Sequence, residues 1–179
     1  MSNPPKILLE CARFRVEEIE QPLDNGAVRR REVVRHPGSV VIVPVVDDER
    51  ICLIRNERPT VGRTLIEFPA GTLEPEEDPR NAAFRELREE TGFQADEMHH
   101  LLDFYPAPGI LDERMSLYLA TGLRAGPPAR EPGEHIENLV VTGMQAQTLV
   151  QSGQIQDAKT LVGIYLYLTR PNGHQRNAE

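Results

Sequence analysis

The segment from Gly71 to Phe93, GTLEPEEDPRNAAFRELREETGF, constrains the fold more than any other part of the chain. Asp78 offers the side-chain acceptor that a helix N-cap needs, and Pro79 suits the first helical position, whose backbone N–H has no partner. Gly92 supplies the left-handed residue that commonly ends a helix. The segment therefore predicts one helix over residues 78–91, with a loop on either side.

Carboxylates gather on one side of this predicted helix. At about 100° per residue, Glu86, Glu89 and Glu90 share a face. An apolar stripe lies beside them and comprises Ala83, Phe84, Leu87 and Thr91. Like charges four residues apart repel, and Arg85 offsets only part of that repulsion, whereas a hard divalent ion such as Mg²⁺ or Mn²⁺ would offset far more. A solvated acidic face is the ordinary alternative for such a pattern.

The spacing within the segment favours the metal-binding interpretation. It matches every fixed position of the Nudix box, GX5EX7REUXEEXGU, where U is a bulky aliphatic or aromatic residue. From about residue 36 to 168 the chain resembles the Nudix hydrolase family, and most closely its ADP-ribose pyrophosphatases and nucleoside diphosphate-sugar hydrolases. This resemblance implies an α/β/α sandwich around a mixed sheet, and hydrolysis of a nucleoside diphosphate linked to another group.

The resemblance also implies a set of metal ligands. They are the box glutamates and a backbone carbonyl, namely Glu86, Glu89, Glu90 and Ala70. Glu89 completes a second metal site or holds a bound water, which makes it a candidate catalytic residue as well. The expected ion is Mg²⁺, with Mn²⁺ as the alternative, because a pyrophosphate repels incoming water unless a cation neutralises its charge.

Four other box residues have structural roles by the same resemblance. Glu77 and Arg85 are expected to tie the loop to the helix through a salt bridge. Gly71 lets the backbone turn sharply beside the metal site, since glycine has no Cβ, and Gly92 ends the helix.

Three residues outside the box are candidates for binding substrate. Arg58 resembles the subfamily's phosphate-binding arginine, and a guanidinium can bind phosphate through two parallel hydrogen bonds. Glu113 follows Pro108 and matches an acidic residue that contacts the terminal ribose in that subfamily. Glu67 stands where the subfamily keeps a glutamate that supports the metal site or a substrate group. Ala107 replaces the usual serine, which leaves substrate choice open.

The general base is expected from the acidic loop EPGEHIE. Glu134 aligns best with the loop glutamate of related enzymes, and Glu131 and Glu137 are alternatives. A glutamate within hydrogen-bond reach of the attacking water can take its proton. A solvated acidic loop explains the same residues equally well.

Three functions follow from these residues. The leading one is Mg²⁺-dependent hydrolysis of ADP-ribose to AMP and ribose 5-phosphate. The second is hydrolysis of GDP-mannose or another nucleotide sugar by the same mechanism. The third is a non-catalytic sensor of a nucleotide metabolite, against which the intact set of box carboxylates argues.

The rest of the chain predicts short strands mixed with helices over residues 144–152 and 157–170. Strands are expected at 14–20, 28–35, 39–46, 50–55, 65–70, 101–105 and 114–121, and a loop at 122–133. Residues 1–35 are expected to form a small antiparallel strand extension, 36–170 the catalytic domain and 171–179 a frayed tail. The resemblance implies a homodimer in which the extension packs against the partner's catalytic domain.

Composition restricts the partners. The chain has 20 Lys and Arg against 28 Asp and Glu, a formal charge of −8, which argues against a nucleic-acid-binding surface. Cys11 and Cys52 have no metal-ligand or redox spacing, so we expect a reduced cytoplasm. No apolar run has the length of a signal peptide or a membrane span, so no membrane partner is expected. A small nucleotide sugar remains the expected ligand.

Overall fold

The computed structural model describes residues 5–130, 133 and 135–170. The strands in these residues are β1 Lys6–Glu10, β2 Arg15–Pro22, β3 Val28–Arg35, β4 Ser39–Pro44, β5 Arg50–Arg58, β6 Arg63–Glu67, β7 Ala70–Thr72, β8 Phe93–Gln94, β9 Glu97–Phe104, β10 Met115–Thr121, β11 Arg124–Ala125 and β12 Ile136–Thr142. The helices are α1 Pro79–Thr91, α2 Gly143–Gln151 and α3 Ala158–Thr169.

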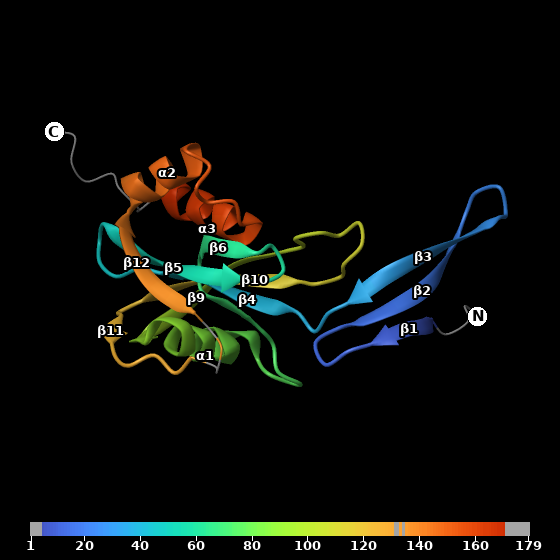
Figure 1. The fold of residues 1–179 in the computed structure, drawn as a ribbon, viewed down its shortest axis with the longest axis horizontal. Coiled ribbons are helices and arrows are strands. Elements are labelled where there is room, and N and C mark those ends of the chain that lie inside the picture. Colours follow the sequence, from blue (N-terminus) through green and yellow to red (C-terminus); the bar gives the residue numbers. More distant parts are fainter. Residues whose placement is uncertain (1–4, 131–132, 134, 171–179) are drawn as a thin grey trace.

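A mixed sheet with the order β7-β4-β10-β9 forms the centre of the molecule. β4 and β10 run parallel, and the other neighbours run antiparallel. Alternate residues of β4 point to opposite faces, as in any strand. Val41 and Val43 join the core cluster that contains Ile164 of α3, whereas Val40 and Ile42 pack in the cluster under α1. Figure 1 shows α1 on one side of the sheet and α2 with α3 on the other, which confirms the predicted α/β/α sandwich.

A second sheet has the order β12-β5-β6 and is antiparallel throughout. The sequence analysis did not predict β12, although it pairs with β5 from Ile136 opposite Asn56 to Thr142 opposite Arg50. The short pair β8 and β11 was also not predicted, because two residues carry no periodic signal.

The strand predicted at residues 65–70 is instead two strands in two sheets. β6 ends at Glu67 and pairs with β5, while β7 begins at Ala70 and pairs with β4. Pro69 lies between them and has no backbone N–H for a ladder, so the chain changes sheet here. Phe68 donates its N–H to Thr160 Oγ1 at 2.8 Å instead. Because of this change, Glu67 belongs to the second sheet and Ala70, three residues later, to the central sheet.

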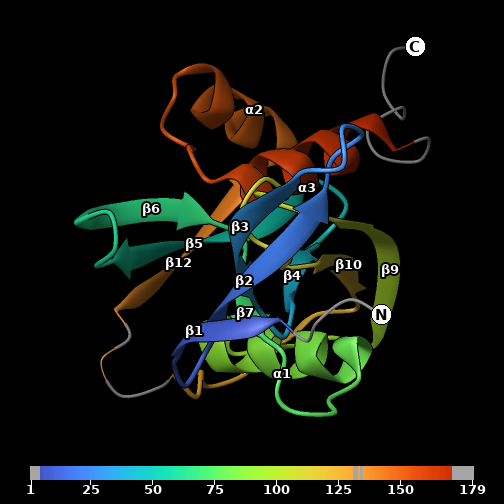
Figure 2. The same cartoon turned by 90° about the vertical axis from the view of Figure 1, so that its right-hand side faces the viewer.

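The first three strands form a separate antiparallel sheet, called the arm below, in the order β1-β2-β3. It extends away from the body of the molecule, formed by β4 to β12 and the three helices, in Figure 1 and lies in front of that body in Figure 2. The predicted hairpin of β2 and β3 is confirmed, and Gly26 closes its turn at a φ of 79°. β1 was not predicted, and all five of its residues are exposed.

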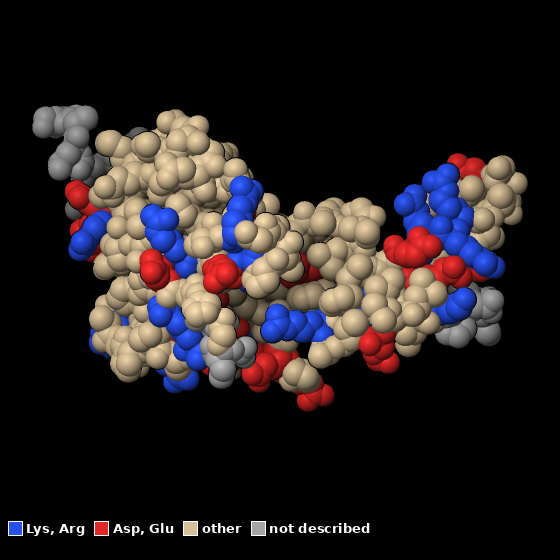
Figure 3. All heavy atoms as spheres, viewed as in Figure 1, with Lys and Arg blue, Asp and Glu red and all other residues tan. Residues whose placement is uncertain are grey.

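The exposed side chains of the arm are of two kinds. Figure 3 shows Lys and Arg gathered on the arm, where β3 exposes Arg29, Arg30 and Arg31. On β1 the exposed side chains include Ile7, Leu8 and Leu9. The arm therefore presents both charge and apolar surface.

The C-terminal helices begin and end within a residue of the predicted limits. Thr142 and Gln145 form a capping box at the start of α2, and Asp157 caps α3 by accepting from Thr160 N–H at 3.0 Å. The tail predicted at 171–179 lies outside the described residues. In the part of the chain that the structure describes, no helix is both long and apolar enough to cross a membrane.

Candidate active site

The box helix α1 has the predicted ends. Asp78 caps it by accepting from Arg80 N–H at 2.9 Å, and Pro79 takes the first helical position. Gly92 ends it in the left-handed conformation, with a φ of 80° and a bond from its N–H to Arg88 O. The apolar stripe faces inward as expected, since Ala83, Leu87 and Thr91 are buried and Phe84 packs partly buried against the same cluster.

The carboxylates of α1 lie against the loop that holds Ala70 and Gly71. Glu90 is 5% exposed, and its Oε2 accepts the N–H of Ala70 at 3.0 Å. A Cβ on Gly71 would lie 1.8 Å from Glu86 Oε1, so another residue at position 71 would force the end of this flexible side chain to move. Gly71 thus leaves space for the carboxylate, and its φ is not in the left-handed region.

Arg85 binds three carboxylates at once. It donates to Glu77 at 2.9 and 2.8 Å, which is the predicted salt bridge, and to Glu86 at 2.6 Å and Glu89 at 3.1 Å. The hydrogen bonds from Arg85 hold the pKa of Glu77 below its ordinary value. A single guanidinium thus links the loop to two box glutamates.

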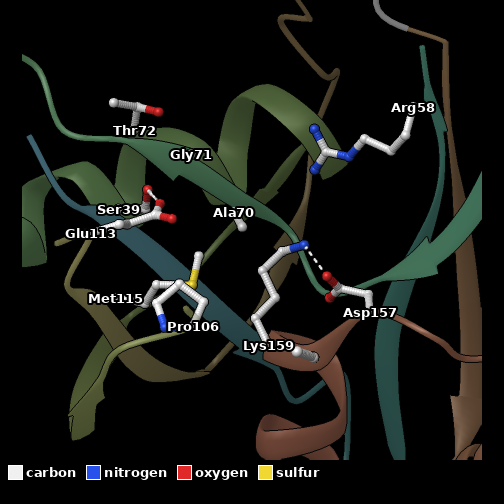
Figure 4. A pocket seen from close by; sticks show the side chains of 11 residues that line it. Ser39, Arg58, Ala70, Gly71, Thr72, Pro106, Glu113, Met115, Asp157 and Lys159 are labelled. Atoms are coloured by element: carbon white, nitrogen blue, oxygen red, sulfur yellow. Dashed lines mark hydrogen bonds and ion pairs between the residues drawn. The ribbon is translucent and has the colours of Figure 1, made fainter. Parts of the chain in front are cut away.

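Two neighbouring cavities meet at this loop. The first has a volume of about 250 Å³ and is lined by Arg13, Arg58, Ala70, Gly71, Thr72, Glu74, Arg85, Glu86, Glu89 and Glu90. The second, of about 310 Å³ and drawn in Figure 4, is lined by Ser39, Arg58, Ala70, Gly71, Thr72, Pro106, Glu113, Met115, Asp157, Ala158 and Lys159. Arg58 and the three residues of β7 line both. The candidate substrate residues Arg58 and Glu113 are thereby brought close to the box glutamates.

Arg58 is held in place by a buried carboxylate. It donates to both oxygens of Glu67, at 2.9 and 2.7 Å, and Glu67 also accepts from Lys159 Nζ at 2.5 Å. Burial raises the pKa of Glu67, but these two cations outweigh it and lower that pKa below its ordinary value. In this arrangement Glu67 anchors two cations, and its role as a direct substrate ligand stays a prediction.

Sequence reasoning did not select Lys159 as a site residue. Lys159 is 8% exposed, lies 92 residues from Glu67 in the chain, and also pairs with Asp157 at 2.9 Å. The segment that contains it was interpreted only as a link into the last helix. The sequence predicts that Lys159 lies in the first turn of α3, after the N-cap. No sequence spacing predicts that it contacts Glu67.

Glu113 is fixed by groups from β4 and the preceding loop. Its carboxylate accepts from Ser39 Oγ and lies 3.5 Å from His36 Nδ1. The neighbouring Asp112 accepts from the N–H of His36 at 2.9 Å and from Arg35 at 2.9 Å. The end of the loop that carries Glu113 is therefore held to the catalytic body and to the arm.

Of the three candidate bases, Glu137 is the one among the described residues. Glu131 and Glu134 lie outside the described residues. Glu137 is exposed on β12, where it lines a third cavity of about 530 Å³ with Arg55 and His135. It is not among the residues that line the two cavities at the box, so the choice of base stays a prediction.

Comparison with known proteins decides the family. A Nudix domain matches residues 34–161, which is more than half of the chain. The chain belongs to the Nudix family. It is 40% identical to the ADP-ribose pyrophosphatase of Bacillus subtilis (strain 168), over 86% of this chain and 83% of that protein. It is 34% identical to the methanol dehydrogenase activator of Bacillus methanolicus, over 91% and 89%. A crystal structure of an ADP compounds hydrolase matches with a TM-score of 0.77, 25% identity and 93% coverage of both chains.

The donor atoms of this Nudix site suit a hard divalent cation. Glu86, Glu89, Glu90 and Ala70 line the same cavity, and oxygen ligands are those that Mg²⁺ prefers. Among the described residues, however, no three acidic, histidine or cysteine side chains stand in a ligating group as they are oriented here. Arg85 accounts for this at Glu86 and Glu89, because it binds both carboxylates. The donor set therefore has the chemistry that such an ion needs, while Arg85 holds two of its carboxylates in this structure.

Proposed function

We propose that this Nudix hydrolase cleaves the pyrophosphate bond of ADP-ribose to give AMP and ribose 5-phosphate, with Mg²⁺ as its metal. The arrangement of the two cavities carries this proposal. One is lined by the box glutamates and the other by Glu113, and Arg58 lines both. A substrate with a diphosphate in the middle and a sugar at the end matches this order of groups. Relatives named ADP-ribose pyrophosphatase support the same substrate.

Glu86, Glu89, Glu90 and the carbonyl of Ala70 would hold Mg²⁺, which neutralises phosphate charge and lowers the pKa of a bound water. The chain's own groups do the rest. Arg58 binds a phosphate oxygen with its remaining N–H groups. The edge of its guanidinium formed by Nε and Nη2 donates to Glu67, which fixes the orientation of the side chain. That fixed geometry orients the phosphate before reaction, which is how positioning lowers a barrier.

Glu113 accepts hydrogen bonds from the hydroxyls of the terminal ribose in this proposal. A carboxylate is an acceptor with two oxygens, so it suits a pair of hydroxyl donors. Glu134 takes the proton of the attacking water as general base, with Glu131 and Glu137 as alternatives.

The second part of the proposal is a homodimer formed through the arm. Ile7, Leu8 and Leu9 of β1 are 52%, 44% and 51% exposed. Adjacent apolar side chains on an edge strand are a surface that another chain can cover. We therefore expect two copies to pack arm against catalytic body, in the cytoplasm. Light scattering coupled to size exclusion should give twice the chain mass of 20.2 kDa.

The activity is tested with purified protein, Mg²⁺ and a panel of ADP-ribose, GDP-mannose, other nucleotide sugars, dinucleoside polyphosphates and nucleoside triphosphates, with products separated by chromatography. AMP and ribose 5-phosphate from ADP-ribose at the highest kcat/KM would support the proposal. A higher kcat/KM for GDP-mannose would identify that nucleotide sugar as the substrate instead. Tight binding of ADP-ribose without turnover of any compound would instead identify a sensor.

A further inference from the structure

A strap crosses the C-terminal end of the catalytic helix. We use this name for residues 126–130, which follow β11. Ala129 N–H donates to the carbonyl of Glu89 at 3.1 Å, and Arg130 Nε donates to the carbonyl of Glu90 at 3.1 Å. The carbonyl of the next residue, Thr91, accepts from Asn138 Nδ2 of β12 at 2.8 Å. Three consecutive carbonyls of α1 are thus bound by groups 40 to 47 positions further along the chain.

These contacts satisfy groups that a helix cannot satisfy itself. The last four carbonyls of an α-helix have no partner within the helix. In α1 the carbonyl of Arg88 accepts from Gly92 N–H, and the next three are those held by the strap and Asn138. The guanidinium of Arg130 also places positive charge at the negative end of the helix dipole. Each of the last four backbone carbonyls of α1 therefore accepts a hydrogen bond.

Gly92 gives independent evidence of how closely the strap lies. A Cβ on Gly92 would be 2.3 Å from the carbonyl oxygen of Gly126 and 2.9 Å from Pro128 N. Both of these are backbone atoms, which cannot turn aside as a flexible side chain can. Pro127 and Pro128 also fix the backbone φ angle of the strap. The box glycine is therefore needed for the strap to pass, in addition to ending the helix with a φ of 80°.

The turn that the strap holds is the one that carries the reactive carboxylates. The carbonyls of Glu89 and Glu90 accept from the strap, and the side chains of the same two residues line the 250 Å³ cavity. A shift of this turn moves both carboxylates together relative to Ala70 and Arg58, which belong to other elements. Misplacement of about 1 Å can cost a hundredfold in rate.

We propose that Arg130 and Asn138 are positioning residues for the reaction, which set the place of Glu89 and Glu90 by binding the backbone of the helix. In this proposal they touch neither substrate nor metal, and Arg130 lines the third cavity together with Glu137. The inference rests on the proposed hydrolysis of ADP-ribose and extends it to two residues that lie outside the box and outside both cavities at the box.

The test uses the full chain with the substitutions Arg130→Gln and Asn138→Ala. Each should lower kcat for ADP-ribose about tenfold or more while KM stays within about twofold, because substrate contacts are unchanged and only the reacting geometry shifts. The Mg²⁺ concentration at half-maximal rate should rise. Arg130→Lys should restore part of kcat, since an ammonium can donate to a carbonyl but has no rigid fork.

Arg124→Gln is the matched control. Arg124 lies on β11 just before the strap, is exposed, and pairs with Asp96 at 2.6 Å instead of with the helix. This substitution removes one positive charge, as Arg130→Gln does, from a position close to the strap. It should leave kcat unchanged. Hydrogen exchange provides a readout that does not depend on activity, and the amides of the last turn of α1 should exchange faster in Arg130→Gln and Asn138→Ala than in the control.

The results separate the two proposals. Unchanged kcat and unchanged exchange in both variants would overturn the positioning role while leaving the proposed function intact. A wild-type protein that does not turn over ADP-ribose would overturn the proposed function, and exchange would still report whether the strap holds the helix. If Arg130→Gln fails to fold, Asn138→Ala decides alone, because it removes only the bond to Thr91 O and a longer one that Asn138 Oδ1 accepts from Arg130 at 3.5 Å.

Discussion

Strands β4 and β1 have similar apolar residues in opposite surroundings. All six residues of β4, SVVIVP, are buried between two helical layers, whereas all five residues of β1, KILLE, are exposed. Burial of apolar area is the main stabilising term in folding. Burial therefore stabilises β4 within this chain, whereas the exposed side chains of β1 gain little from it. The catalytic body therefore completes its own core, while the arm presents exposed apolar surface, which the proposed homodimer would cover.

The largest effect is expected in the body. Glu90→Gln keeps the shape of the side chain and an acceptor for Ala70 N–H, but it removes the charge that a metal ion needs. We expect kcat for ADP-ribose to fall roughly a thousandfold, about 4 kcal/mol of barrier. Steady-state kinetics measure this, with circular dichroism to show that the fold is intact. Glu49→Gln, in the exposed turn before β5, is the control, and full activity of Glu90→Gln would refute the assignment.

Next comes the stability of the central sheet. Leu117 of β10 is 0% exposed and belongs to the core shared with α3. Leu117→Ala should lower the free energy of unfolding by about 3 kcal/mol, because it removes buried methyl groups and leaves a cavity. Urea denaturation gives the value. A loss below about 1 kcal/mol would show that this part of the body tolerates voids.

A smaller and pH-dependent effect is expected where the arm joins the body. The hydrogen bond from Arg35 lowers the pKa of Glu17 below its ordinary 4.5, and Arg15 adds to this against the opposing effect of burial. Arg35 also binds Asp112 of the body at 2.9 Å. Because the folded pKa is the lower one, the contribution of Glu17 is complete above about 4.5 and is lost as the pH falls through the folded value.

Hydrogen exchange of β2 and β3 against pH measures this effect. Wild-type protein should lose protection in the arm below about pH 4.5, ahead of the central sheet. Glu17→Gln should have the weaker arm already at neutral pH and a flatter pH profile. An arm whose protection follows that of β4 at every pH would mean that the two regions unfold as one unit.

The smallest effect on the isolated chain is expected at β1. Leu9→Ala should change the free energy of unfolding of the monomer by about 0.5 kcal/mol or less, since surface substitutions rarely do more. The same change should weaken self-association, because Leu9 is 51% exposed before a partner covers it. Sedimentation at several concentrations measures association. Association that is unaffected by Leu9→Ala would place the dimer contact elsewhere.

Local rules predicted the box helix well. The cap at Asp78, the proline after it and the left-handed Gly92 each act through neighbouring residues, and all three are confirmed. Strands β4 and β5 were also predicted, because long apolar runs between turn residues carry their own signal. The spacing of the box gave the resemblance to the Nudix family, and that resemblance implied the fold class.

Long-range pairing could not be predicted in the same way. β12 follows an acidic loop, and only its register with β5 makes it a strand. β1 lacks alternation because both of its faces are exposed. The network of Arg58, Glu67 and Lys159 joins three elements through side chains, and no sequence distance encodes that. The roles of the box glutamates and of Arg58 and Glu113 in catalysis stay predictions, and Glu90→Gln tests the metal assignment among them.

The contacts of Arg85 have a practical consequence. Its guanidinium binds Glu77, Glu86 and Glu89, so part of the repulsion between the acidic groups is offset by a charge that the polypeptide itself supplies. Chelators such as EDTA should then stop turnover without unfolding the protein, and adding the ion back should restore it. We therefore expect the protein to stay folded through purification and storage in chelator, with the ion supplied only at the moment of assay.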